Sequence, residues 1–360
     1  MTLDIPKVIV NSTTQVQSTI PEGLAGDVGV IADLGTASTD FIIANNPREL
    51  QEKLGDTVLA SPTNDVKGLF KLFEQKEDNN GVTSVTIAPV GSSYTYTTFG
   101  NALDKLESED FDILVIPKPL AYESATINSI SVTDVYLALL KNWKDTRYTS
   151  KEGVGCIFAM EESATSGQDI KTRITNFGRG GYCVLTQKVN NLSYPESVCF
   201  MAATIAGMKL NKSLTHKIVP GIESIQDEIL FKDSNSDGYK YMNKGITVLR
   251  PFNRRLGEYG VLRSVTPEGL DLSIERSADY MTKAFQLKDF LGDTNNTITI
   301  DSIQGEINTR KRYFIETLHL CEDINVTVTK IDKGTVEVDL EYIFNGIIDL
   351  IKVYIQIKVE

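Results

Sequence analysis

The stretch FIIANNPRELQEKLG, residues 41–55, decides the fold class of this 360-residue chain, because an apolar strand leads directly into a punctuated helix. Asn46 is a residue type that caps helix N-termini, and the proline that follows it suits the first helical turn. Leu50 and Leu54 are spaced to share one helix face, and Gly55 is a typical stop signal. The stretch therefore predicts a strand–turn–helix unit.

The same alternation extends on both sides of this unit, from residue 21 to about residue 235. Short apolar strands are predicted at 27–33, 82–90, 112–117, 153–161 and 180–187, and helices at 65–75, 132–145 and 195–210. Apolar strands that alternate with helices are typical of a largely parallel sheet that is buried on both faces. We therefore expect residues 21–235 to form an α/β domain.

The pattern changes after a polar, glycine-containing stretch at 230–241. Two helices are predicted at 271–292 and 301–320, followed by alternating strands on either side of an IDKGT turn, which indicates a hairpin. The positions that we expect to face inward are Ile274, Ala278, Met281 and Phe285 on the first helix and Ile303, Ile307, Phe314 and Leu318 on the second. Asp301 with Gln304 predicts a capped start for the second helix. Residues 236–345 therefore indicate an α+β unit.

Both ends of the chain read as extended arms. Residues 1–20 begin with the strand-like LDIPKVIV, in which Leu3, Ile5, Val8 and Val10 are apolar, and continue with polar residues. Residues 346–360 finish in KVYIQIKVE, where alternation places four apolar side chains on one face: Val353, Ile355, Ile357 and Val359. From alternation alone, this strand is equally suited to pairing within its own subunit and to pairing with a neighbour.

The composition limits the partners and the compartment. The net charge is −12 and the sequence has no long basic tract, which argues against nucleic acid as a partner. Four scattered cysteines without a CxxC motif favour buried free thiols in a reducing cytoplasm. We expect no signal peptide and no membrane insertion, because no apolar run reaches the roughly 18–20 residues that a span requires.

Three segments resemble chemical motifs, and in each a structural interpretation is favoured. DSNSDG, residues 233–238, matches the start of a calcium loop, but Lys244 occupies the position where a bidentate carboxylate is needed. GRGG, residues 178–181, precedes a strand and lacks phosphate-loop spacing, so a turn is expected. Asp33 follows a strand as in subtilisin-type folds, but the two histidines lie in unsuitable segments and no serine motif occurs. We expect no catalytic residue, no metal and no cofactor.

Two basic clusters stand out in this acidic chain: Arg250, Arg254, Arg255 and Arg263, and the run Arg310, Lys311 and Arg312. They suit either a solvated face or a positive surface that docks on an acidic protein partner. The sequence leaves both interpretations open.

Seven segments, taken in order, resemble those of contractile tail sheath proteins of phages and phage-derived injection systems. They are IPKVIVNST (5–13), IPEGLAGDVGVIADLGTASTD (20–40), PRELQEKLGD (47–56), FDILVIPKP (111–119), PESVCFMAATIAGMKLNKSLTHKIVPGIESI (195–225), MNKGITVLRPFNRRLGEYGVLRSVT (242–266) and TVEVDLEYIFNGIIDLIKVYIQIKV (335–359). Two departures stand out. Gly260–Ser264, with the sequence GVLRS, replaces the family's Trp-Gly-Ala-Arg-Thr, and the proline of the closing segment is missing.

The resemblance implies a fold with an inserted, subtilisin-like outer α/β domain without a catalytic triad, and an α+β core domain that faces a tail tube. It implies that the arms at 1–20 and 346–360 complete a small sheet in neighbouring subunits. The partners would be further copies in a helical sheath of stacked hexameric rings, the tube protein, and baseplate and tail terminator proteins. The particle would be a virion tail or a tailocin-like injection system, made in a bacterial cytoplasm.

Two other function classes remain open from the sequence alone. One is a hydrolase built on a subtilisin-like sheet, and the other is a different self-assembling structural protein, such as a surface-layer or microcompartment component.

Overall fold

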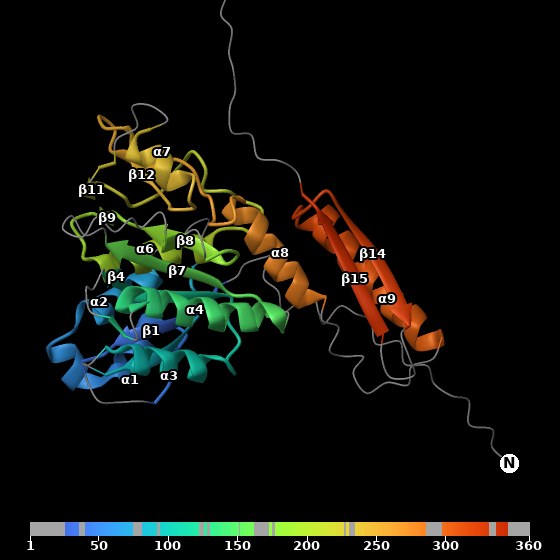
Figure 1. Ribbon diagram of the computed structural model, residues 1–360, viewed down its shortest axis with the longest axis horizontal. Coiled ribbons are helices and arrows are strands. Elements are labelled where there is room, and N and C mark those ends of the chain that lie inside the picture. Colours follow the sequence, from blue (N-terminus) through green and yellow to red (C-terminus); the bar gives the residue numbers. More distant parts are fainter. Residues whose placement is uncertain are drawn as a thin grey trace, which may run out of the picture.

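The computed structural model of the chain (Figure 1) describes residues 26–35, 40–74, 81–91, 94–121, 126–127, 130–150, 152–161, 173–174, 177–226, 228–229, 235–285, 297–330 and 336–344. The predicted arm strands, with Leu3, Ile5, Val8 and Val10 in one and Val353, Ile355, Ile357 and Val359 in the other, lie outside these residues.

A six-stranded sheet forms the centre of the larger part of the molecule, in the order β2-β3-β1-β4-β7-β8. Every neighbouring pair is parallel except the one that the edge strand β2 makes with β3. The strands are β1 Asp27–Asp33, β2 Ile42–Ala44, β3 Ser84–Val90, β4 Ile113–Ala121, β7 Gly155–Glu161 and β8 Gly181–Leu185. Side chains along the central strands are buried in both directions, which confirms the predicted parallel, buried sheet.

Helices cover both faces of this sheet. α1 (Pro47–Ala60), α2 (Asn64–Glu74) and α6 (Tyr194–Gly207) pack on one face, and α3 (Tyr96–Leu106) and α4 (Val132–Thr149) pack on the other. The Asn46 side chain accepts a hydrogen bond from the Glu49 amide, as predicted for an N-cap. Gly55 adopts φ 72° and interrupts α1, but the helix resumes and continues to Ala60.

Smaller elements pack beside the main sheet, and they include residues 237–261, which the sequence prediction placed in the C-terminal unit. β10 (Lys217–Ile218), β13 (Glu258–Val261) and β12 (Leu249–Asn253) form a three-stranded sheet, and α7 spans Asp237–Met242. Two short pairs are β9 (Lys188–Val189) with β11 (Ile225–Gln226), and β5 (Thr126–Ile127) with β6 (Ile130–Ser131). Tyr241, Ile246 and Val248 belong to the same apolar cluster as α3 and α4.

A separate unit with its own core follows (Figure 1). It contains α8 (Leu272–Ala284), α9 (Thr297–Arg312), a π-helical turn at Tyr313–Thr317, β14 (Asp323–Lys330) and β15 (Val336–Ile343). Its core includes Met281, Phe285, Ile307 and Phe314, as predicted. The predicted order of two helices and a hairpin is thus confirmed in the described residues.

Two details of this unit differ from the sequence prediction. α9 begins at Thr297, so Asp301 lies inside the helix and does not cap it. On α8, Ile274 and Ala278 are only partly buried, whereas Glu275, Arg276 and Asp279 are buried. The helix thus buries a polar face at its start and an apolar face at its end.

Candidate functional site

The β14–β15 hairpin forms a two-stranded sheet of eight-residue strands, paired from Asp323↔Ile343 to Lys330↔Val336. Val338, Leu340 and Tyr342 pack against the core of this unit, and the alternate residues of β15 face outward. Among the described residues, no further strand pairs with either edge of the hairpin. Two long edges with unpaired N–H and C=O groups are a surface that readily accepts additional strands.

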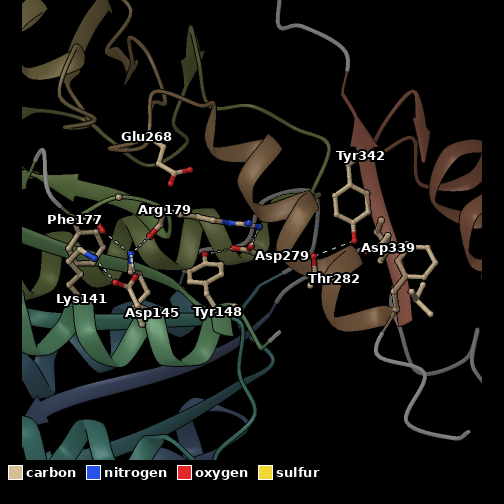
Figure 2. Close-up of a pocket in the computed structure, with 16 residues that line it drawn as sticks. Lys141, Asp145, Tyr148, Phe177, Arg179, Glu268, Asp279, Thr282, Asp339 and Tyr342 are labelled. Carbon is tan, nitrogen blue, oxygen red and sulfur yellow. Dashed lines mark hydrogen bonds and ion pairs between the residues drawn. The ribbon is translucent and has the colours of Figure 1, made fainter. Parts of the chain in front are cut away.

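A cleft lies beside β15, between that strand and the α/β domain (Figure 2). Its volume is about 770 Å³. One wall is formed by α4 and the 177–179 turn, and the other by α8 and β15. The residues that line it include Lys141, Asp145, Tyr148, Arg179, Thr282, Phe285, Val338, Leu340 and Tyr342. On β15 the cleft therefore borders Asp339 as well as the apolar Val338, Leu340 and Tyr342, and it faces charged groups of the opposite wall.

A buried carboxylate on α8 connects the two walls (Figure 2). Asp279 accepts hydrogen bonds of 2.6 Å from the hydroxyls of Tyr148 and Tyr182, and its other oxygen lies 2.5 Å from the Arg179 guanidinium. Burial, reinforced by the Asp279 charge, raises the pKa of both tyrosines well above the usual value. Both hydroxyls therefore stay protonated and act as donors at neutral pH.

A second carboxylate lies one helical turn earlier on α8. Glu275 accepts hydrogen bonds from the Gly180 amide at 2.9 Å and from the Thr266 hydroxyl at 2.5 Å. Burial raises the pKa of Glu275 to about 7. The 177–179 turn is also held from α4, where the buried Lys144 ammonium donates to the carbonyl oxygens of Phe177 and Arg179, at 2.8 and 2.5 Å.

These contacts make the GRGG segment an anchored turn, as predicted, with Gly178 and Gly180 at positive φ of 72° and 84°. We refer to Glu275, Asp279, Tyr148, Tyr182 and Arg179 as the α8 clasp. The clasp fixes the first half of α8 to the α/β domain, while the second half of the helix packs in the core of the C-terminal unit. The sequence prediction missed this role because it looked for apolar residues on α8, although two carboxylates spaced i, i+4 were visible.

Comparison with solved structures identifies the same architecture in two other proteins. A sheath tail protein from Listeria innocua superimposes with a TM-score of 0.59 at 11% sequence identity, over 92% of this chain and 98% of that one. A sheath tail protein from Desulfitobacterium hafniense gives 0.60 at 10% identity, over 90% and 98% of the two chains. This chain has the fold of the sheath tail proteins. The predicted resemblance is thus confirmed at the level of the fold.

No protein-family model matches the sequence, and no curated protein matches it either. At sequence identities of 10–11%, the sequence resemblance lies in the order and spacing of degenerate segments. The likeness to the sheath tail proteins is therefore much clearer from the superimposed structures than from the sequences.

The basic residues lie at two separate places on the sheath fold. Arg254 and Arg255 occupy the turn of the β12–β13 hairpin, with Arg250 on β12 and Arg263 just after β13. Arg254 pairs with Glu228, and the Arg250 guanidinium lies over the Phe252 ring. Both turn residues are exposed. Whether this cluster binds a partner stays a prediction.

The second basic cluster lies at the end of α9. Arg310 pairs with Glu306 at 2.8 Å and also donates to the Ala284 carbonyl, and Lys311 pairs with Asp323 at 2.8 Å. Arg312 is exposed and makes no ion pair with any residue in the described part of the chain. Only Arg312 of this run is therefore available to an external partner without breaking an internal contact.

The strand-end aspartate lies in a structural environment. Asp33 accepts the Gly35 amide at 2.7 Å, and its own amide donates to the buried Asp65, whose pKa burial raises to about 6. Neither histidine is a hydrogen-bond partner of Asp33 within the residues that the structure covers, and both are exposed at positive φ. Asp33 is thus a turn residue, as expected.

The other sequence motifs can be placed as well. Ser236 precedes α7, so the second half of the calcium-like segment is helical rather than a loop. Among the described residues, no group of three potential metal ligands occurs, and no helix is long and apolar enough to cross a membrane. All four cysteines are buried and free, as predicted.

Proposed function

We propose that this chain is the structural subunit of a contractile tail sheath. In this proposal, subunits polymerise around a tail tube in a metastable extended state. A trigger at the baseplate lets them repack into a shorter lattice, which drives the tube through a cell envelope. The role is mechanical and requires no catalytic residue and no cofactor.

The observation that carries the proposal is the unpaired hairpin within a sheath fold. The hairpin packs on the helices of its unit through one face, but its strand edges stay unpaired among the described residues, and exposed strand edges are usually blunted or covered. Here each strand of the hairpin has eight residues, and the cleft of about 770 Å³ runs beside β15. An additional strand from another copy would pair with the edge and fill part of this cleft.

The predicted arms match such a surface chemically. In the C-terminal arm, Val353, Ile355, Ile357 and Val359 would face the core side, where Val338, Leu340 and Tyr342 lie. Each main-chain hydrogen bond contributes about 0.5–1.5 kcal/mol, and each fully buried Val or Ile side chain about 1.5–3 kcal/mol. Several such contacts hold subunits together firmly. The N-terminal arm, with Leu3, Ile5, Val8 and Val10, would pair with the second unpaired edge of a hairpin.

The remaining parts of the proposal follow from the resemblance. The α/β domain is a subtilisin-like outer domain without a triad, and the unit from α8 onward belongs to the core domain that faces the tube. The proposed boundaries are 1–20, 21–235, 236–345 and 346–360. The partners are further copies in stacked hexameric rings, a tube protein, a baseplate and a tail terminator, in a virion tail or a tailocin-like particle.

The arm exchange is tested by deleting Lys352–Glu360. We expect a folded chain that no longer assembles into tubes in electron micrographs and that sediments as a monomer. A matched control replaces only the polar-face residues Lys352 and Gln356 by serine, which leaves the apolar face intact and should preserve assembly. Polymerisation of the deletion variant into normal tubes would refute the arm exchange.

A further inference from the structure

The turn of the β12–β13 hairpin carries an exposed apolar residue beside an unpaired cation. Leu256 is 70% exposed, and its neighbour Arg255 makes no ion pair with any described residue. The Asn253 side chain accepts hydrogen bonds from the amides of both residues, at 3.1 and 3.4 Å. The turn is therefore ordered by its own contacts, and we call Arg254, Arg255 and Leu256 the basic tip.

The outward face of β15 carries the opposite charge. Glu337, Asp339 and Glu341 alternate along it, and Ile343, which is 39% exposed, continues the same row. We call these four residues the acidic row. Their cross-strand partners on β14 include only neutral residues opposite the three carboxylates: Thr329, Thr327 and Asn325.

No cation within the described residues neutralises this row. Glu341 accepts a hydrogen bond from the Asn325 amide at 2.9 Å, and Glu337 and Asp339 have no ion-pair partner there. Alternate residues of one strand are separated by about 7 Å, so the three charges repel one another. A cation from outside the subunit would relieve this repulsion.

We propose that the basic tip of one copy docks on the acidic row of a second copy. Arg255 would lie against the carboxylates and Leu256 against Ile343. The contact would therefore pair a cation with anions and an apolar side chain with another apolar side chain. The inference rests on the proposed self-assembly and adds a contact to it. Strand addition uses the edge of β15, where Asp339 also lines the cleft, whereas Glu337 and Glu341 are not part of the cleft lining and stay accessible on the outward face.

The position of the two surfaces makes the contact heterologous. β12 packs beside the six-stranded sheet, and β15 lies on the opposite side of the molecule (Figure 1), so the basic tip of one copy cannot reach the acidic row of the same copy. A contact between two different surfaces of the same chain propagates head to tail and generates rings or helical filaments. This geometry is the one that a tubular polymer requires.

A charge swap tests the inference directly. The first variant is Arg255→Glu, and the second carries Glu337→Lys together with Asp339→Lys. We expect each to raise the concentration needed for polymerisation about tenfold, which is the effect of losing roughly 1.4 kcal/mol at a contact. Arg48→Glu on α1, whose side chain is 89% exposed, is the matched control and should polymerise normally.

Rescue distinguishes docking from a general charge effect. A chain that carries both changes, or an equimolar mixture of the two variants, places glutamate against lysine again and should polymerise near the wild-type concentration. The docking contact is overturned if polymerisation weakens in the single variants and is not restored by combining them, or if neither variant polymerises less readily than the wild type. If the docking contact fails this test but the wild-type chain still forms normal tubes, the sheath proposal stands.

Wild-type chains that form only short oligomers, and whose oligomers weaken with the charge swap, would refute the sheath proposal and support the docking contact. A wild-type chain that does not associate at all would refute both the sheath proposal and the docking contact.

Discussion

Asp279 on α8 accepts a 2.6 Å hydrogen bond from the hydroxyl of Tyr182 on β8, 97 residues earlier in the chain. The contact is buried, and the same carboxylate also holds Tyr148 and Arg179. Through these bonds, one side chain joins the C-terminal unit to the parallel sheet of the α/β domain. In the proposed sheath subunit, this connection would transmit force between the C-terminal unit and the α/β domain.

We predict that Asp279→Ala destabilises the chain by about 2–4 kcal/mol, because it leaves two buried hydroxyls and a partly buried guanidinium without their acceptor. Urea unfolding measures this loss. Asp339→Ala, on the exposed face of β15, is the matched control and should change the free energy of unfolding by less than about 0.5 kcal/mol. Equal effects of the two substitutions would show that the clasp is not a stabilising contact.

The pKa of Glu275 predicts an unusual dependence of stability on pH. The folded value of about 7 lies above the ordinary glutamate value of 4.5, so the folded chain binds more protons between these two pH values. Stability should therefore fall as pH rises from about 4.5 to 7, by an amount on the order of 2–3 kcal/mol from this group. The measurement is urea unfolding as a function of pH.

Glu275→Gln keeps an acceptor for Gly180 and Thr266 but cannot ionise. We expect it to raise the free energy of unfolding above pH 7 and to match the wild type near pH 4.5. Asp65, with a pKa raised to about 6 by burial, contributes in the same direction, so the profile of this variant should flatten without becoming level. If the free energy of unfolding of Glu275→Gln depends on pH in the same way as that of the wild type, the raised pKa does not belong to Glu275.

Two glycines form a contrasting pair. A Cβ on Gly260 would lie 2.0 Å from the Lys217 carbonyl oxygen and 2.6 Å from the Phe252 ring, so Gly260→Ala should break the β10–β13 pairing and destabilise the chain by more than about 2 kcal/mol. A Cβ on Gly305, inside α9, would have no neighbour within 4 Å among the described residues. Gly305→Ala should instead stabilise by about 0.5–1 kcal/mol. Thermal unfolding compares the two variants, and destabilisation by both would contradict the open space at Gly305.

The α/β domain was predictable because its signals are local. The Asn46 cap, the Leu50 and Leu54 spacing and the apolar β1 all depend on residues within one element, and all three are confirmed. The clasp was not predictable in the same way, because the burial of Asp279 depends on tyrosines from α4 and β8 that are distant in sequence. The predicted start of α9 at Asp301 was wrong for a related reason. Asp301 and Gln304 form a valid capping pattern, but the helix begins four residues earlier at Thr297.

The end of α9 provides the last prediction, which concerns the tube. Arg310 and Lys311 are held by Glu306 and Asp323, whereas Arg312 is exposed and unpaired among the described residues. If the unit that contains α9 faces an acidic tube, Arg312→Glu should weaken co-sedimentation with tube protein several-fold, and most strongly at low salt, because exposed charges are screened. Arg48→Glu on the exposed surface of α1 is the control for net charge, and it should leave tube binding unchanged if α1 belongs to the proposed outer domain. Equal binding by wild type and Arg312→Glu across the salt series would remove Arg312 from the proposed tube contact.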